Sequence, residues 1–144
     1  MRFWDASAIV PLVIEEAGSQ VLRALLADDP LMVVWWATHT ECVSALARLE
    51  REGLLDTHSL EAGHKRLSQL LANWEEVEPH DEVRETAARF LRVHALRAAD
   101  ALQLAAAFVA AGRRPSSLQM AVRDARLASA AQKEGFSVVE IAGE

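Results

Sequence analysis

The sequence predicts a three-layer α/β/α protein, in which helices cover both faces of a central, mostly parallel sheet of four to five strands. Short apolar runs alternate with longer segments of helical periodicity along the chain. The run 31–36 is apolar without alternation, as in a strand that is covered on both faces. The 144 residues show no repeat and no linker, so we expect one domain over residues 1–144.

The first half of the chain alternates strand and helix signals. A strand is expected at 2–4, and helices at 8–14 and 17–27 precede the strand at 31–36. The next helix is expected to begin at Thr38 and to end near Gly53. A further long helix is predicted over 56–74, and the acidic stretch 75–82 fits a short strand or a connector.

The second half repeats this alternation. A helix is expected over 83–96, followed by one over 97–112 that is apolar almost all round, as in a central buried helix. A polar loop at 113–117 then leads to the remaining elements. These are a strand at 118–122, a helix at 124–134 that Gly135 closes, and a last strand at 136–141.

The composition is that of a globular protein, with 51% hydrophobic and 25% charged residues. We find no apolar run long enough to cross a bilayer and no signal-peptide pattern, so we expect no membrane partner and a cytoplasmic location. The formal net charge of −6 argues weakly against nucleic acid. Residues 83–144 nevertheless carry more basic than acidic side chains, so local binding of a polyanion stays open.

Two carboxylates are predicted to emerge at one edge of the sheet. Asp5 directly follows the first strand, and Asp124 follows the strand 118–122 with one residue between. In an open parallel sheet, ligands gather outside the carboxyl ends of the strands. Each residue also has a simpler interpretation as a helix cap: for Asp5 the two are equally favoured, and for Asp124 alone the cap is favoured.

Two further acids are candidates for the same site. Asp100 lies in the first turn of a helix made otherwise of Ala and Leu, where a carboxylate needs a partner such as a metal or Arg97. Glu41 either belongs to a capping box that begins at Thr38 or points towards Asp5, and the spacing fits both.

Several carboxylates that converge in one pocket repel one another, and a hard divalent cation relieves this repulsion. All-oxygen ligation suits Mg²⁺ or Mn²⁺. The matching chemistry is metal-assisted hydrolysis of a phosphodiester. The five histidines lack the His-x-x-x-His spacing of a zinc site, and no glycine-rich phosphate loop follows a strand.

Four short motifs carry a resemblance to a known family. In chain order they are Asp5-Ala-Ser-Ala, Thr40-Glu41 at the start of a helix, Arg97-Ala-Ala-Asp100-Ala-Leu-Gln-Leu-Ala, and Arg123-Asp124-Ala-Arg-Leu. Their order and spacing resemble those of PIN domains, especially the VapC-type toxins of bacterial toxin–antitoxin pairs. The likeness spans almost the whole chain.

The resemblance implies a PIN fold and a Mg²⁺- or Mn²⁺-dependent endoribonuclease. Asp5, Glu41, Asp100 and Asp124 correspond to the catalytic acids. Of these, Asp5, Asp100 and Asp124 correspond to the metal ligands, and Glu41 would orient water or a second metal. Ser7 would support the first aspartate. The implied partners are RNA, a small antitoxin protein and a second copy of the chain, with a possible higher toxin–antitoxin assembly.

Two positions depart from the family pattern. The family usually has Thr or Ser where Ala6 stands, and a small hydroxyl residue where Val122 stands. The second departure keeps another function class open besides the ribonuclease toxin. In this alternative the chain is a catalytically weakened PIN-like scaffold that serves as a partner-binding or regulatory module.

Overall fold

The computed structural model describes residues 1–139 and residue 141. Five strands form the sheet: β1 (Arg2–Trp4), β2 (Met32–Trp35), β3 (Glu75–Val77), β4 (Gln119–Ala121) and β5 (Val138–Val139). The α-helices are α1 (Ala6–Val13), α2 (Ser19–Asp28), α3 (Thr38–Arg51), α4 (Thr57–Leu71), α5 (Asp81–Val93), α6 (Ala98–Ala110) and α7 (Ala125–Lys133).

All strand pairs are parallel, and the order across the sheet is β3-β2-β1-β4-β5. From β1 the chain moves outward to β2 and β3, then returns to β4 on the other side of β1 and continues to β5. The topological switch point therefore lies between β1 and β4. In open α/β sheets this is where the carboxyl ends of the strands leave a crevice for ligands.

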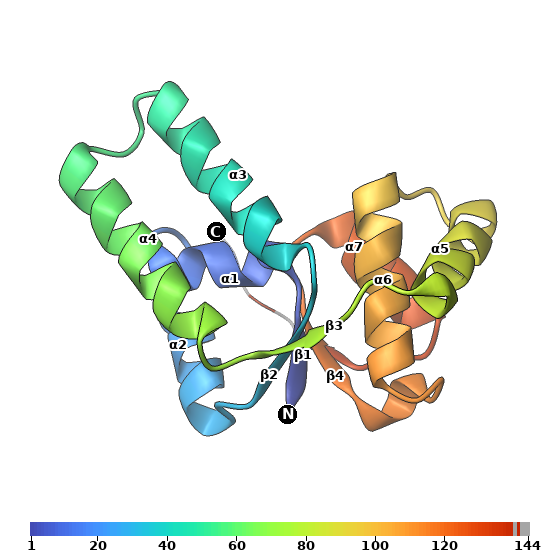
Figure 1. Cartoon of the computed structure of the whole chain (residues 1–144). Coiled ribbons are helices and arrows are strands. Elements are labelled where there is room, and N and C mark those ends of the chain that lie inside the picture. The colour runs from blue at the N-terminus through green and yellow to red at the C-terminus, as the bar shows by residue number, and fades with distance from the viewer. Residues whose placement is uncertain (140, 142–144) are drawn as a thin grey trace.

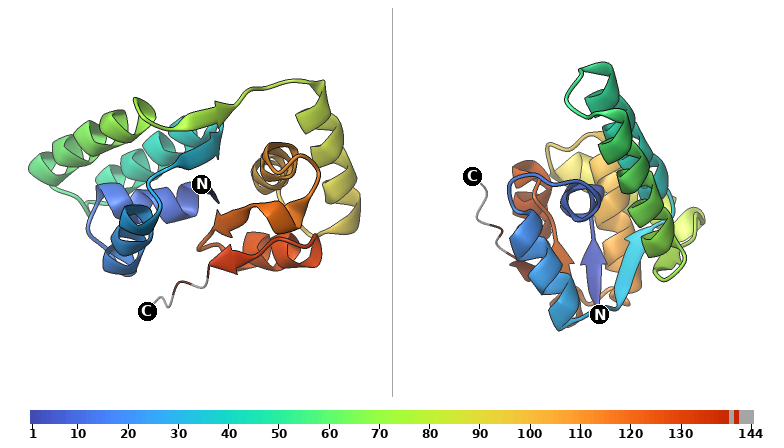
Figure 2. Two further views of the ribbon diagram at one scale, coloured as in Figure 1. Left: turned by 90° about the horizontal axis from the view of Figure 1, so that it is seen from below. Right: turned by 90° about the vertical axis from the view of Figure 1, so that its left-hand side faces the viewer.

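Helices cover both faces of the sheet (Figures 1 and 2). Helices α1 to α4 form one layer and α5 to α7 form the other. Each layer closes its own hydrophobic core. Neighbouring residues of β1 supply both cores, because Phe3 packs with Phe90 and Leu104 while Trp4 packs with Ile9 and Leu46. This division follows from the alternation of side chains along a strand.

The fold class and the element order predicted from the sequence are confirmed, and the boundaries differ by a few residues. Helix α5 begins two residues earlier than expected, at Asp81, and ends at Val93. The expected polar loop at 113–117 contains a 3₁₀ turn, η1 (Pro115–Ser117). The last strand is shorter than the predicted 136–141, and residue 140 of that prediction lies outside the described residues.

Helix α6 is buried along its middle, from Gln103 to Ala107, as expected for a central helix. It packs against α5 and against β2, with its N-terminus at the carboxyl edge of the sheet. Over the residues that the structure covers, no helix has both the length and the apolar character that a membrane span requires.

Candidate metal centre

The four acids predicted from the sequence all lie near the N-terminal end of a helix. Asp5 is the N-cap of α1, and Asp124 is the N-cap of α7. Asp100 lies in the first turn of α6, and Glu41 lies in the first turn of α3. Helices α1, α3 and α7 directly follow parallel strands, so their N-termini meet at one sheet edge.

Asp5 is the most deeply buried of these acids, with 5% of its surface exposed. Its amide N–H donates to the carbonyl of Ala121 on β4 at 3.1 Å, and its carboxylate accepts from the Ser7 amide at 3.0 Å. Burial raises the pKa of Asp5 to about 6; hydrogen bonds from Ser7 lower it, and the charges of Asp100 and Asp124 raise it. Asp5 is therefore a helix cap and also part of a carboxylate cluster.

Ser7 connects the two ends of this cluster. Its Oγ accepts hydrogen bonds from the amides of Arg123 at 2.9 Å and Asp124 at 3.3 Å. The side chain of Asp124 accepts from the Leu127 amide at 2.9 Å. The nearby Val122 is buried in the core. The loop before α7 is thus held by the hydroxyl of Ser7 and by the cap at Asp124, although Val122 offers no hydroxyl.

Asp100 lies between acidic and basic neighbours. Partial burial and the charge of Asp124 raise the pKa of Asp100, whereas Arg97 and Arg126 lower it. The described residues include no carboxylate within 4.0 Å of either arginine. The alternative of a direct ion pair between Asp100 and Arg97 is therefore not what the structure contains.

Glu41 does not form the capping box that its spacing allowed. The N-cap of α3 is Ala37, which makes no side-chain cap, and Thr38 lies inside the helix. The carboxylate of Glu41 instead accepts a hydrogen bond from Nε2 of Gln103 on α6. Burial raises the pKa of Glu41 to about 7; the bond from Gln103 lowers it, and the charges of Asp5 and Asp100 raise it.

Gln103 is a site residue that the sequence analysis did not single out. It is 1% exposed, and its Nε2 also donates to Oγ1 of Thr38 at 3.0 Å. Its Oε1 is buried and makes no hydrogen bond in the described structure. The signal was present in the sequence, because Gln103 stands one helical turn after Asp100 and so lies on the same face of α6.

Two opposing effects set the charge state of this cluster. A helix N-terminus favours a nearby carboxylate by about 0.3–1 kcal/mol. Desolvation and mutual repulsion outweigh this contribution, because the pKa values of Asp5, Glu41 and Asp100 are all raised. The cluster therefore carries excess negative potential that a cation relieves.

The donor set fits a hard divalent cation, because it consists of carboxylates whose charges raise one another's pKa. The acids are near one another, but they do not form a complete coordination shell by themselves. Within residues 1–139 and 141, no three Asp, Glu, His or Cys side chains are close enough to enclose a metal ion. Such an ion would complete its coordination with water or substrate oxygen, as Mg²⁺ commonly does.

Comparisons with known proteins agree with the fold. The PIN domain family model matches residues 2–114. The chain is 32% identical over 136 residues to Ribonuclease VapC45 and, equally, to Ribonuclease VapC49, each from a strain of Mycobacterium tuberculosis. These matches cover 94% of this chain and 92% of each relative. The crystal structure of FitAcB from Neisseria gonorrhoeae superposes with a TM-score of 0.66 at 20% identity, covering 97% of both chains.

The parallel fold and the match to the family model together define a PIN-domain protein. The chain belongs to the PIN-domain family, and its similarity to the two ribonucleases places it among the VapC-type members.

We expect Ser7→Ala to destabilise the protein by about 1–2 kcal/mol, because the amides of Arg123 and Asp124 lose their acceptor. The free energy of unfolding in urea measures this cost. Ser7→Thr is the matched control, because it keeps the hydroxyl and should keep most of the stability. Equal stability of the Ala variant and the parent protein would show that Ser7 does not hold this loop.

Without divalent metal, stability should fall as the pH rises from about 4 to 7, because Asp5 and Glu41 in the folded state keep protons that the unfolded chain has released. Asp5→Asn retains a cap acceptor and removes the ionisation. It should therefore stabilise the protein at pH 8 by an amount on the order of 2 kcal/mol, and much less at pH 4.

Thermal and urea unfolding in EDTA at both pH values test this expectation. The control is Glu61→Gln, which removes an exposed carboxylate on α4. A stability difference between Asp5→Asn and the parent protein that does not change with pH would contradict it.

Proposed function

We propose that this chain is a Mg²⁺- or Mn²⁺-dependent endoribonuclease that acts as the toxin of a toxin–antitoxin pair. The observation that carries the proposal is the group of four carboxylates at the switch point of a PIN fold, three of them with raised pKa values. The names of the two related ribonucleases support RNA as the substrate. When bound, a divalent ion would supply the positive charge that activates water and stabilises charge on the scissile phosphate.

We assign the metal to Asp5, Asp100 and Asp124, with water molecules bridging to the carboxylates that do not reach the ion directly. The main chain fixes Asp5 and Asp124, because both cap helices that are joined through Ser7. Asp100 comes from the first turn of α6. Each of the three residues therefore lies at the start of a regular helix, which suits a preorganised site.

Glu41 has a different role in this proposal. A pKa of about 7 allows the carboxylate to accept and return a proton near neutral pH. The hydrogen bond from Gln103 fixes its orientation. We assign Glu41 the task of orienting the attacking water and taking its proton. A role toward a second metal ion is the alternative for the same side chain.

The competing proposal is a scaffold that has lost catalysis, which the valine at position 122 suggested. The missing hydroxyl at position 122 is a weaker argument for lost catalysis in this structure. The hydroxyl of Ser7 holds the loop before α7, and the Leu127 amide holds the side chain of Asp124. We therefore favour the enzyme. We also propose a homodimer, higher assembly with the antitoxin, and a cytoplasmic location, on the basis of the family resemblance.

The purified protein should cleave RNA when Mg²⁺ or Mn²⁺ is added and should stop when EDTA is added. Asp5→Asn and Asp100→Asn should each lower the rate by at least about 100-fold, since each removes a charge that holds the ion. Glu61→Gln on α4 is the control and should keep full activity. Undiminished cleavage by both Asn variants, each verified as folded, would refute the proposed active site.

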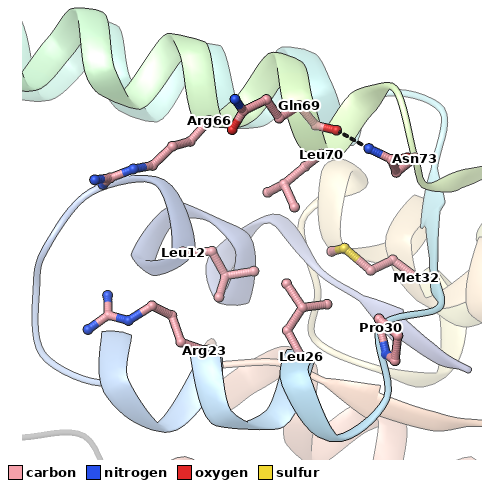
Figure 3. A pocket seen from close by; sticks show the side chains of 9 residues that line it. All are labelled: Leu12, Arg23, Leu26, Pro30, Met32, Arg66, Gln69, Leu70 and Asn73. Carbon is pink, nitrogen blue, oxygen red and sulfur yellow. Dashed lines mark hydrogen bonds between the residues drawn. The ribbon is translucent and has the colours of Figure 1, made fainter.

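We propose that the antitoxin binds on the layer formed by helices α1 to α4. A cavity of about 380 Å³ lies among α1, α2, α4 and β2 (Figure 3). Its floor is apolar, and the arginines, Gln69 and Asn73 lie at its edge; the lining residues are Leu12, Arg23, Leu26, Pro30, Met32, Arg66, Gln69, Leu70 and Asn73. This pattern suits an amphipathic segment with aliphatic side chains and nearby carboxylates.

Leu26→Arg should weaken binding of the cognate antitoxin by about tenfold or more, because it places a charge in the apolar floor. RNA cleavage by the free toxin should not change. The control is Leu54→Arg, because Leu54 is 67% exposed and lies outside this cavity. Titration calorimetry of the two purified proteins measures the affinity, and equal affinity of Leu26→Arg and the parent would place the antitoxin elsewhere.

A further inference from the structure

One face of α7 carries basic and hydroxyl side chains beside a second cavity. Arg126, Ser129 and Lys133 follow one another at helical spacing, and together with the end of α5 they line a cavity of about 430 Å³. The α5 side is formed by Val93, His94 and Ala95. We propose that this cavity binds backbone phosphates of the RNA strand next to the scissile bond. The proposal rests on the ribonuclease function proposed above and names a substrate contact for it.

The cavity lies beside the acidic site. Helix α7 begins at the cap Asp124, and Arg126 stands two residues further along. The charges of Arg126 and Arg97 both lower the pKa of Asp100, so both guanidinium groups lie within electrostatic range of that carboxylate. A strand whose scissile phosphate lies at the carboxylates therefore has cations immediately beside it.

Two other arginines of the second half of the chain already have a carboxylate partner. Arg113 pairs with Glu82 at 3.1 Å, and Arg123 pairs with Glu16 at 3.3 Å. Arg126 and Lys133 have no carboxylate within 4.0 Å among the described residues. Their charge is available to a bound anion.

The one carboxylate that lines this cavity is already engaged. Glu134 contacts Nε2 of His94 at 2.6 Å, and the imidazole side chain is only 6% exposed. This contact joins the C-terminal end of α5 to the C-terminal end of α7, because His94 and Glu134 are the C-caps of those helices. The pair thus fixes the distance between the two walls of the cavity.

The length of the basic face matches a nucleic-acid backbone. From Arg126 to Lys133 the helix rises about 10 Å, at 1.5 Å per residue. A strand of a duplex has one phosphate per 3.4 Å of helix axis, so this face extends beyond a single nucleotide. An acidic peptide could also bind these cations, but its own carboxylates would be repelled by the adjacent cluster of acids. RNA brings its scissile phosphate to that cluster and its neighbouring phosphates to α7.

The test is the salt dependence of RNA binding. The affinity of a fluorescein-labelled single-stranded uridine oligomer is measured by anisotropy in EDTA over a series of salt concentrations. The comparison is between the parent chain and the double variant Arg126→Ala/Lys133→Ala. Each lost phosphate contact changes the slope of log K against log salt by about 0.7, so the slope should become shallower by about 1.4. The control Arg51→Ala/Lys65→Ala removes two exposed cations on α3 and α4 and should keep the parent slope.

Thermal unfolding verifies that both double variants are folded. An unchanged slope in Arg126→Ala/Lys133→Ala overturns the proposal. So does the result that this variant loses affinity for a poly-glutamate peptide and keeps its affinity for RNA, since the face would then bind an acidic protein.

Cleavage by the parent protein with Mn²⁺ is measured in parallel. A shallower slope without any cleavage supports the phosphate site and refutes the ribonuclease. Cleavage with an unchanged slope supports the ribonuclease and refutes this phosphate site.

Discussion

The site depends on the parallel pairing of β1 with β4 in the middle of the sheet. The register pairs Trp4 with Ala121. The amide of Asp5 extends this pairing, because it donates a hydrogen bond to the carbonyl of Ala121. The hydroxyl of Ser7 continues this connection to the loop before α7. A continuous series of hydrogen bonds therefore runs from the sheet to the two helix caps. Asp5 and Asp124 are positioned by the main chain, with little freedom left to their side chains.

This arrangement places the carboxylate of Asp5 in a buried position, where a charged group is unfavourable. Asp5 follows a strand whose side chains Phe3 and Trp4 are fully buried, so its carboxylate has almost no contact with water. Four helix N-termini offset part of the cost, yet the raised pKa values show that they do not offset all of it. The metal-free protein is therefore less stable than its core alone would make it. Retained strain of this kind is common where a site serves binding or catalysis.

Hydrophobic periodicity was sufficient to predict the layers, the order of the elements and the meeting of Asp5 with Asp124. These features follow from local patterns and from the rule that parallel strands share a carboxyl edge. The place of Glu41 depended on a contact with Gln103, which is 62 residues away in the sequence. The local pattern at Thr38 matched a capping box, but tertiary packing buried that hydroxyl against Gln103. A spacing rule cannot identify such a partner.

Under the proposed ribonuclease function, the net charge of −6 limits how this chain can bind RNA. At physiological salt, charges are screened beyond about 8 Å, so the overall repulsion acts only weakly at a distance. Attraction must then come from cations that lie within that range of the bound strand. Arg97 and Arg126 lie beside the carboxylates, and the basic face of α7 extends from them. Because few such cations are present, electrostatic affinity for RNA in general should be modest. Selection among RNAs then falls to how well a strand fits both α7 and the acidic crevice, which is recognition by shape.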